Sequence, residues 1–504
     1  MKMRDRHQAV LPWGKIALPV LVFILTAFIY GQFGFQGKLY RDDANLLYSS
    51  QRMAEGVPPY ISIFNHTVPL PPLLGGLGVA ISKKMGWNDL YTVRFLFFMI
   101  GCLTAVSVYF LGSAFWGSQW IGFMVALVFI QFFPFAKSAI SGPQKKVPMV
   151  LFEVLALLLT SKKRWFWAGL CGSLAFLTWQ AMGIFPIVTL FLAAISPEKD
   201  RLQNILRTTV GIVLPLIFVI SYFYFYGAFW QLLDGAILFN IRHIDRRTTS
   251  LFYPFFRLIY VVGFRYDALL LPILIGLIMM VYISLRKISQ YSSFKALLNR
   301  DPFAPLLITF PAPLLWSLID FQGIPDFFVF LPYVSIGFGY FIDVIFQQMK
   351  ELLLKNRSHP FYQRAPQFFL IGLVAALIAF AEVNVFLHKD SELGNQKKGA
   401  IEIEHRFGRE VRFLSIGTPE LLVLLHRENP NPYVFIISGI DRYIHEKSNN
   451  GFEGWLKELE AFRPEVIGFG ETHGRHTPKL MDWMNSNYHP EQIGPWHIYV
   501  RNPK

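Results

Sequence analysis

Uncharged apolar runs recur along most of this chain, and they restrict its fold more than any other feature. They lie at 13–31, 68–82, 95–111, 119–136, 148–160, 165–178, 180–196, 208–226, 267–285, 302–319, 327–346 and 367–387. A helix of about 20 apolar residues is long enough to cross a bilayer. Charged residues make up 16% of the chain, compared with roughly 25% in soluble domains. The pattern therefore predicts a mainly α-helical, polytopic membrane protein whose shorter runs form tilted, broken or re-entrant helices.

The basic residues between the runs predict the orientation of the spans, because cytoplasmic loops are rich in Lys and Arg. This rule places Lys83–Lys84 and Lys162–Lys163 in the cytoplasm, yet three apolar runs separate the two clusters. Either one of those runs is re-entrant or one cluster lies outside. The other clusters predict that residues 32–67 and the chain after residue 388 lie on the outer face. We expect about eleven to thirteen transmembrane helices, and an odd count fits this placement best.

The C-terminal part of the chain has a different composition. Residues 389–504 contain 15 Lys/Arg and 16 Asp/Glu, whereas residues 1–388 hold the remaining 32 Lys/Arg against 17 Asp/Glu. Helical stretches alternate there with strand-like runs, which lie at 411–416, 433–437, 466–468 and 497–500. This alternation predicts a small α/β domain at 389–504 on the outer face, beside a transmembrane domain at 1–388. No soluble segment carries a basic patch interleaved with aromatic residues, so nucleic acid is not an expected partner.

Two acidic residues, Asp42 and Asp43, follow the first apolar run and begin the first outer loop, 32–67. Charged groups at the edge of the lipid are costly to keep, so they are candidate functional residues. The alternative is a solvated turn leading out of the first helix. Apolar residues then recur at helical spacing up to Ala54, which predicts a short amphipathic helix on the bilayer surface. The two carboxylates are therefore expected at the membrane edge.

The loop also carries a family resemblance. Its acids are followed by Gly56, Pro59, Tyr60 and Pro69, and two further matches are the segments Ala168–Gln180 and Pro325–Tyr333. Together they resemble GT-C membrane glycosyltransferases, in the branch of dolichyl-phosphate-mannose mannosyltransferases and aminoarabinose transferases. Three positions depart from that pattern: Asp43 where Glu is usual, Trp179 where Lys is common, and Ser141–Gln144 where a Pro-Asp motif is expected.

The resemblance implies transfer of a sugar from a polyprenyl-phosphate-linked donor to a glycan, lipid or protein acceptor, with inversion at the anomeric carbon. It also implies an integral protein of a bacterial plasma (inner) membrane, in contact with membrane lipids. Asp42 matches the position of the general base. Asp43 is a second catalytic candidate, either as a helper or as an orienter of Arg41 or Arg52. A like-charged neighbour raises one of the two pKa values.

Basic residues on the outer side are candidates for stabilising the phosphate leaving group. These candidates are Lys145, Lys146, Arg242, Arg246 and Arg247. The alternative for each cluster is a solvated basic loop. Among the other loop residues, Tyr60 belongs to the family motif, His66 either lines the acceptor site or forms a turn, and Asp326 either contacts the sugar or caps a helix.

No cofactor is expected. Asp42 and Asp43 could act as hard oxygen ligands of a divalent cation, but the outer loops are poor in further acids, which favours a metal-independent reaction. Glu471, His473 and His476 have the side chains of a metal site, and a solvated loop is the favoured interpretation.

Two other classes of protein remain as alternatives. A polytopic transporter or lipid flippase should show two symmetric halves with broken helices in matching positions, and the sequence shows no such symmetry. A non-catalytic scaffold whose C-terminal domain binds a partner is the second. The acidic pair followed by a surface helix has no evident role in transport, so a glycosyltransferase is the preferred reading.

Overall fold

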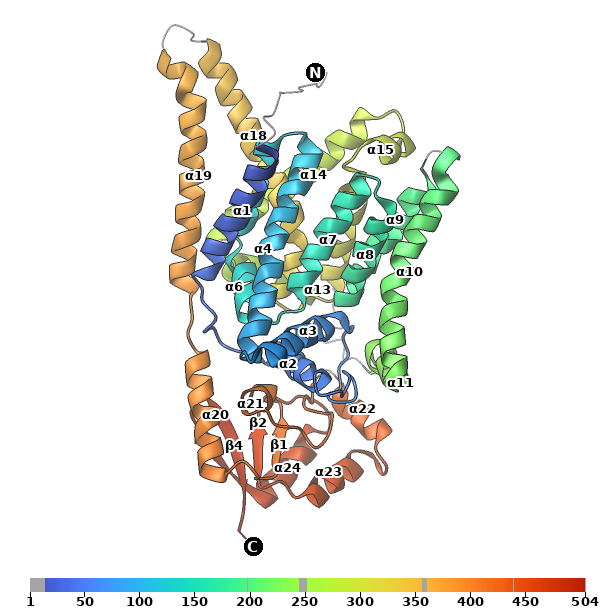
Figure 1. The fold of residues 1–504 in the computed structure, drawn as a ribbon, viewed down its shortest axis with the longest axis vertical. Helices are drawn as coiled ribbons and strands as arrows, with labels where there is room; N and C mark the ends of the chain where they lie inside the picture. Colours follow the sequence, from blue (N-terminus) through green and yellow to red (C-terminus); the bar gives the residue numbers. More distant parts are fainter. Residues whose placement is uncertain (1–13, 197, 244–251, 356–359, 438, 504) are drawn as a thin grey trace.

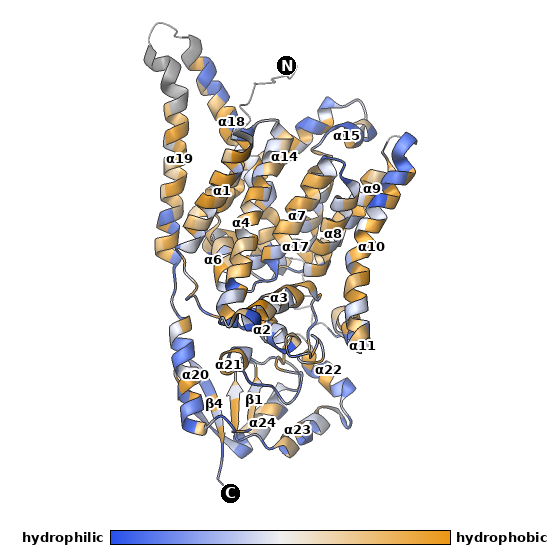
Figure 2. Ribbon diagram, viewed as in Figure 1, coloured by the Kyte–Doolittle hydropathy of each residue, from blue (hydrophilic) through white to orange (hydrophobic). Residues whose placement is uncertain are grey.

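The computed structural model describes residues 14–196, 198–243, 252–355, 360–437 and 439–503. A tall helical bundle carries a smaller domain at one end, and the long helix α19 (Pro360–His388) leads from the far end of the bundle towards that domain (Figure 1). Most bundle helices are hydrophobic along their length, whereas the smaller domain is mixed (Figure 2). The predicted mainly α, polytopic membrane fold with a small C-terminal α/β region is confirmed.

The bundle is built from helices of very different lengths. They are α1 (Gly14–Gly31), α4 (Asp89–Trp116), α5 (Gln119–Ile130), α6 (Phe133–Ser141), α7 (Lys146–Ser161), α8 (Trp165–Thr178), α9 (Ile184–Ala194), α10 (Arg201–Phe225), α14 (Leu270–Gln290), α16 (Ala304–Thr309), α17 (Pro311–Ile319), α18 (Leu331–Lys355) and α19. Shorter elements join them: η1 (Gln180–Gly183), η2 (Glu198–Asp200), α11 (Phe229–Leu233), η3 (Asp234–Leu238), α12 (Phe239–Arg242), α13 (Phe252–Phe264), η4 (Asp267–Leu269), α15 (Phe294–Arg300) and η5 (Ile324–Phe330).

Five helical segments in the described part of the chain are long and apolar enough to cross a membrane. They are Asp89–Trp116, Arg201–Phe225, Leu270–Gln290, Ile324–Leu352 and Phe368–Phe407. The pair α5 and α6, bent by 69°, makes a sixth if it is one broken span. The remaining apolar helices of the bundle are shorter, so the expected count of eleven to thirteen spans stays a prediction.

Two helices lie across the end of the bundle, between it and the C-terminal domain: α2 (Arg41–Met53) and α3 (Leu70–Met85) (Figure 1). Run 68–82 was expected to be a span, but it forms α3, which packs along α2. A side chain at Gly75 would collide with Ser50, whose Oγ donates to the Pro72 carbonyl at 3.1 Å. Glycines in this helix thus allow close packing on a neighbour, which hydropathy does not reveal.

The position of α3 corrects the predicted orientation. Lys83 Nζ donates to the Ala54 carbonyl at 3.3 Å and lies 4.0 Å from Glu55. Gln51, on the same helix α2, lies 3.4 Å from His426 of the C-terminal domain. Lys83 and the C-terminal domain therefore share one end of the molecule, so the cytoplasmic placement of Lys83–Lys84 is not supported, and the alternative that one basic cluster lies outside fits this arrangement.

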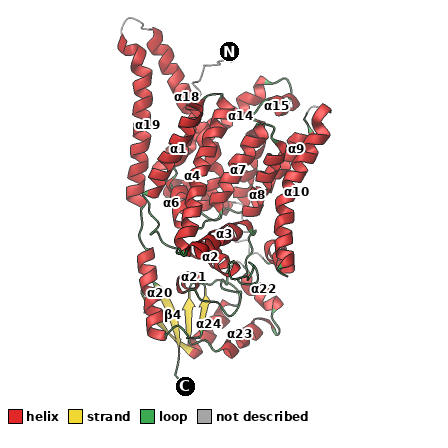
Figure 3. Ribbon diagram, viewed as in Figure 1, coloured by secondary structure: helices red, strands yellow, loops and turns green. Residues whose placement is uncertain are grey.

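The C-terminal domain contains the strands of the described chain (Figure 3). Its sheet has the order β1-β2-β4-β3, with β1 (Phe413–Ile416) parallel to β2 (Val466–Phe469), and with β4 (Trp496–Arg501) antiparallel to both β2 and β3 (Tyr488–Ile493). Helices pack around it: α20 (Leu393–Phe407), α21 (Pro419–Leu425), α22 (Ile440–Lys447), α23 (Gly451–Phe462) and α24 (Thr477–Asn487). The strand expected at 433–437 does not form; Val434 of that segment accepts a hydrogen bond at 2.6 Å from Gly417 N, just after β1.

Candidate active site

Helix α2 is held between the bundle and the C-terminal domain from its first residue. Leu39, two residues before the helix, is fixed by Gln396 of α20, which accepts from Leu39 N at 2.8 Å and donates to the Leu39 carbonyl at 2.9 Å. Asp42 and Asp43 then occupy the first turn, where the partial positive charge of a helix N-terminus favours carboxylates. The expected helix after the acidic pair is present, at Arg41–Met53.

The two neighbouring acids have opposite environments. Asp42 is exposed, whereas Asp43 is 5% exposed and accepts a hydrogen bond from Gln144 Nε2 at 3.3 Å. Burial raises the pKa of the Asp43 carboxyl well above its usual range, and the charge of Asp42 raises it further, while Arg94 opposes both. This arrangement favours a protonated Asp43 beside an Asp42 that solvent and substrate can reach.

Lys145 and His66 share the electrostatic environment of Asp42. Burial lowers the pKa of His66 to about 4, the charge of Lys145 lowers it too, and Asp42 opposes this. His66 is therefore a neutral imidazole at physiological pH, and its ring lies 5.8 Å from that of Phe239. Lys145 is half-buried and forms no hydrogen bond or ion pair with any residue that the structure describes. A cation without a described partner and the exposed carboxylate thus influence the same neighbours, His66 and Asp43.

Lys146 is buried and already paired. Its Nζ contacts Asp326 and lies 3.7 Å from the centre of the Trp179 ring. Asp326 also accepts from Gly323 N at 3.2 Å, so it caps η5 as the capping interpretation expected. A buried cation with a carboxylate partner has little capacity left for a phosphate, which favours Lys145 over Lys146.

Arg41 and Arg52 bind the C-terminal domain. Arg41 Nη1 donates to Glu471 Oε2 at 2.9 Å, and Arg52 Nη2 donates to Glu428 Oε1 at 2.7 Å. The hypothesis that Asp43 orients one of these arginines is therefore wrong. No group of three His, Cys, Asp or Glu side chains suited to a metal ion occurs among the described residues.

Tyr60 and Arg242 form no hydrogen bond or ion pair with Asp42 or Asp43 in the part of the chain that the structure describes. Tyr60 is buried, its hydroxyl donates to the Thr67 carbonyl at 2.5 Å, and its ring packs 5.5 Å from Phe223, so it shapes its own loop. Arg242 is exposed at the end of α12. Arg246 and Arg247 lie outside the described residues.

The C-terminal domain covers α2 directly. Asn429 N donates to Tyr48 Oη at 3.0 Å, and Phe64 N donates to the Pro432 carbonyl at 2.7 Å. Glu420, in the first turn of α21, is 8% exposed, and burial raises the pKa of its carboxyl to about 7. Sequence reasoning missed Glu420, and it noted Gln144 only as the end of a segment that departs from the expected Pro-Asp motif. A lone acid in the apolar helix Pro419–Leu425 was the available signal for Glu420.

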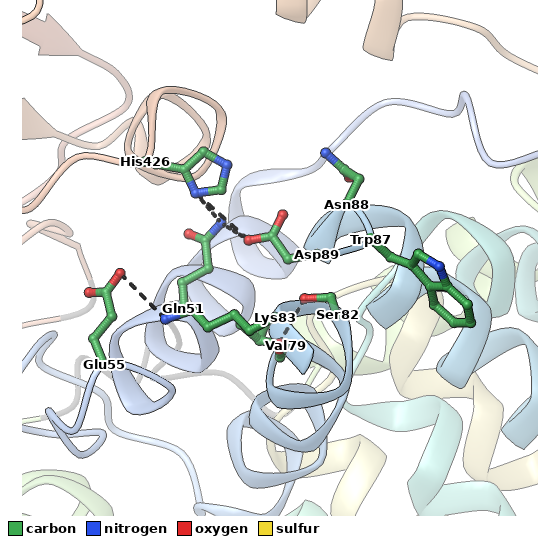
Figure 4. Close-up of a pocket in the computed structure, with 9 residues that line it drawn as sticks. All are labelled: Gln51, Glu55, Val79, Ser82, Lys83, Trp87, Asn88, Asp89 and His426. Carbon is green, nitrogen blue, oxygen red and sulfur yellow. Dashed lines mark hydrogen bonds and ion pairs between the residues drawn. The ribbon is translucent and has the colours of Figure 1, made fainter. Parts of the chain in front are cut away.

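A cavity of about 230 Å³ lies farther along α2, against α3 and the start of α4 (Figure 4). Gln51 Nε2 donates there to Asp89 Oδ2 at 2.8 Å, and His426 of the C-terminal domain faces the same pair (Figure 4). Gln51 follows Asp42 by nine residues, which is about 13.5 Å along a helix. The cavity is lined by Gln51, Glu55, Val79, Ser82, Lys83, Trp87, Asn88, Asp89 and His426. It is therefore distinct from the surroundings of Asp42.

Comparisons with known proteins identify solved structures with the same fold. ArnT from Cupriavidus metallidurans in the apo state aligns with a TM-score of 0.58 and 12% identity, over 97% of this chain and 99% of that chain. The archaeal oligosaccharyltransferase AglB from Archaeoglobus fulgidus, in complex with an inhibitory peptide and a dolichol-phosphate, aligns with a TM-score of 0.55 and 13% identity, over 97% of this chain and 75% of that chain. A family-model scan and a search of curated proteins give no match. At these identities the likeness shows the fold.

Proposed function

We propose, from the premise that this chain has the GT-C fold of membrane glycosyltransferases, that it transfers a sugar from a polyprenyl-phosphate-linked donor to an acceptor. The shared fold extends over 97% of the chain. One solved protein with this fold holds a dolichol-phosphate, which supports a donor of that class here. The acceptor is a glycan, a lipid or a protein.

The observation that carries the proposal is that the exposed carboxylate of Asp42 and the cation of Lys145, unpaired among the described residues, both act on the same two groups, Asp43 and His66. Sugar transfer requires a base that removes the proton of the acceptor group as the new bond forms. Asp42 is the reachable carboxylate of the pair, since Asp43 is buried and bonded to Gln144. We assign the general base to Asp42 and the helper role to Asp43.

The leaving group of this reaction is a lipid phosphate, and positive charge must stabilise the negative charge that develops on it. Lys145 is the candidate that fits best, because its ammonium group has no carboxylate partner among the described residues. The charge of Lys145 reaches both Asp43 and His66, so donor and acceptor would meet between these groups. A direct displacement at the anomeric carbon, with inversion, follows from a single base opposite the leaving group.

We place the reaction on the outer face of a bacterial plasma (inner) membrane. The last membrane helix, α19, follows the basic segment before it and leads into the C-terminal domain, and basic loops are cytoplasmic. The site then opens on the side opposite the cytoplasm. We keep residue 388 as the proposed domain boundary.

The test is sugar transfer by the purified protein in lipid nanodiscs, with a panel of polyprenyl-phosphate sugars and envelope extract as acceptor. The wild-type protein should release polyprenyl phosphate and label an acceptor, and Asp42→Asn should not. Addition of EDTA should leave the wild-type rate unchanged, because Lys145 rather than a divalent cation supplies the positive charge. Movement of a lipid across vesicles without cleavage of the donor would instead identify a flippase and refute the proposal.

A further inference from the structure

Glu420 is a buried carboxyl group that the proposed reaction does not yet use. It lies in the first turn of α21, in the C-terminal domain, 378 residues after Asp42 in the sequence. Its side chain is 8% exposed, and its Oε2 is buried without a hydrogen-bond partner. Buried polar atoms are almost always hydrogen-bonded, so an unsatisfied carboxyl oxygen calls for an explanation.

The surroundings of Glu420 connect it to the acidic pair on α2. Helix α21 packs on α2, and the charge of Glu420 raises the pKa of the Asp43 carboxyl. Asp42 in turn raises the pKa of Glu420, while Arg41 and Lys38 lower it. Three carboxyl groups from two domains therefore share one electrostatic environment.

The other two elements that pack on α21 are β1, whose sequence FLSI has no titratable side chain, and α20. Helix α20 presents Lys397, whose Nζ donates to Tyr91 Oη at 3.0 Å and lies over that ring. Arg41, although close to Glu420, is bonded to Glu471. Glu420 therefore has no direct ion-pair partner among the described residues. A buried carboxylate without such a partner is costly, and protonation removes its charge.

We propose that Glu420 is a positioning residue of the active site, through which the C-terminal domain controls the charge on the first turn of α2. The inference rests on the proposed glycosyl transfer. Closely spaced buried carboxyl groups cannot all be ionised, so they hold their protons as a coupled set. A neutral Glu420 leaves Asp42 as the main negative charge facing the acceptor, whereas an ionised Glu420 adds a second charge and favours the protonated form of Asp43.

The direction of the pH effect follows from the pKa of about 7 for Glu420. Below that pH the carboxyl is neutral, and above it the carboxylate is negative. The pH dependence of kcat should therefore contain an ionisation near neutral pH that belongs to the coupled carboxyls. Removing the ionisable group at position 420 should remove that step.

The experiment compares the full-length variants Glu420→Gln and Glu420→Asp with the wild type across the pH range in the nanodisc transfer assay. The matched control is Glu428→Gln, because Glu428 lies on the same domain, bonds to Arg52 of α2 and is 67% exposed. Glu420→Gln should lose the ionisation near pH 7, Glu420→Asp should retain one, and Glu428→Gln should keep the wild-type profile. A wild-type profile in Glu420→Gln, or equal slowing of both Gln variants with unchanged profiles, would overturn the proposal.

Infrared difference spectroscopy provides a readout that does not need activity. The wild-type protein should show the carbonyl band of a protonated carboxyl group that disappears between mildly acidic and mildly alkaline pH, and Glu420→Gln should lack it. Its persistence in the variant would overturn the inference about Glu420 even if transfer occurs. Failure of the wild type to transfer any sugar, with this band present, would instead refute the proposed function alone.

Discussion

At the scale of single residues, two pairs of adjacent side chains of the same type differ in burial and in their partners. Asp42 is exposed and Asp43 is buried. Lys145 has no described partner, and Lys146 is paired with Asp326 under the Trp179 ring. In each pair the side chain without a fixed partner is the one available for chemistry, while the other holds the local structure.

Replacement of Asp43 tests the difference between the two acids. Because burial raises the pKa of Asp43, the neutral amide in Asp43→Asn resembles the protonated side chain and should lower kcat by less than about tenfold, against about 10²–10⁴-fold for Asp42→Asn. Asp43→Ala removes the acceptor of Gln144 and should cost about 1–3 kcal/mol of unfolding free energy. Transfer rates and thermal unfolding of the three variants measure both effects, and equal kinetic losses in the two Asn variants would contradict the assignment.

Replacement of Lys145 tests the stabilisation of the phosphate. Lys145→Ala should lower kcat by about 10²–10³-fold, as expected when one group that stabilises transition-state charge is lost. Lys145→Arg should recover part of the rate, since it restores the charge. Lys84→Ala, an exposed lysine at the same end of the molecule, is the control and should match the wild type. Equal rates for Lys145→Ala and Lys84→Ala would remove Lys145 from the site.

At the scale of secondary-structure elements, the sandwiched pair α2 and α3 determines where the acids lie. The chain turns back after the loop at 54–69, so that α3 runs along α2 instead of crossing the membrane. Small residues at the contact allow the two helices to approach closely, because a side chain at Gly76 would meet Met53.

Enlarging a residue at this contact should displace α2. Gly75→Val would place a branched side chain against Ser50, and overpacking of this kind costs about 1–3 kcal/mol. We expect a lower unfolding temperature together with a lower transfer rate. Gly31→Ala is the matched control, since nothing lies within 4 Å of a side chain at that position. A Gly75→Val protein with wild-type stability would show that the contact is not tight.

These elements also show what sequence could and could not predict. The helix after the acidic pair was predicted because its apolar residues recur at helical spacing. Helix α3 was mistaken for a span because hydropathy measures the composition of a run and not the surface against which it packs. Gln144 was noted only as the end of a segment that departs from the expected Pro-Asp motif, and Glu420 was missed. Both meet α2 from distant parts of the chain, and such contacts depend on tertiary structure. The capping role of Asp326 could be predicted because it depends on local sequence. Its pairing with Lys146 could not, because the two residues are distant in the chain.

At the scale of the whole molecule, helix α2 and the C-terminal domain meet at one end of the bundle (Figure 1). The C-terminal domain contacts α2 through Arg41, Arg52 and Tyr48. Because α3 lies there too, Lys84 and the exposed Arg409 of the C-terminal domain belong to one side of the membrane. Lys295 of α15 is exposed in the connection between α14 and α16, and we expect it on the opposite side.

Cysteine labelling in intact cells tests this topology. The native Cys102 and Cys171 are buried, so single variants Lys84→Cys, Arg409→Cys and Lys295→Cys report on their own positions. A membrane-impermeant maleimide should label the first two without permeabilisation and the third only after it. If Lys84→Cys and Lys295→Cys were instead labelled only after permeabilisation, Lys84 would lie on the side opposite Arg409, and α3 would be a membrane span.

The cover over α2 has a consequence for biosynthesis. The acids are synthesised long before their partners in α20 and α21, since Glu420 follows Asp42 by 378 residues. A product truncated before the C-terminal domain would still contain the membrane helices, but the first turn of α2 would be uncovered and would lack its contact with α21. The site is therefore complete only after the C-terminal domain has been made and has packed on α2, and this long-range contact is a late, slow step of folding.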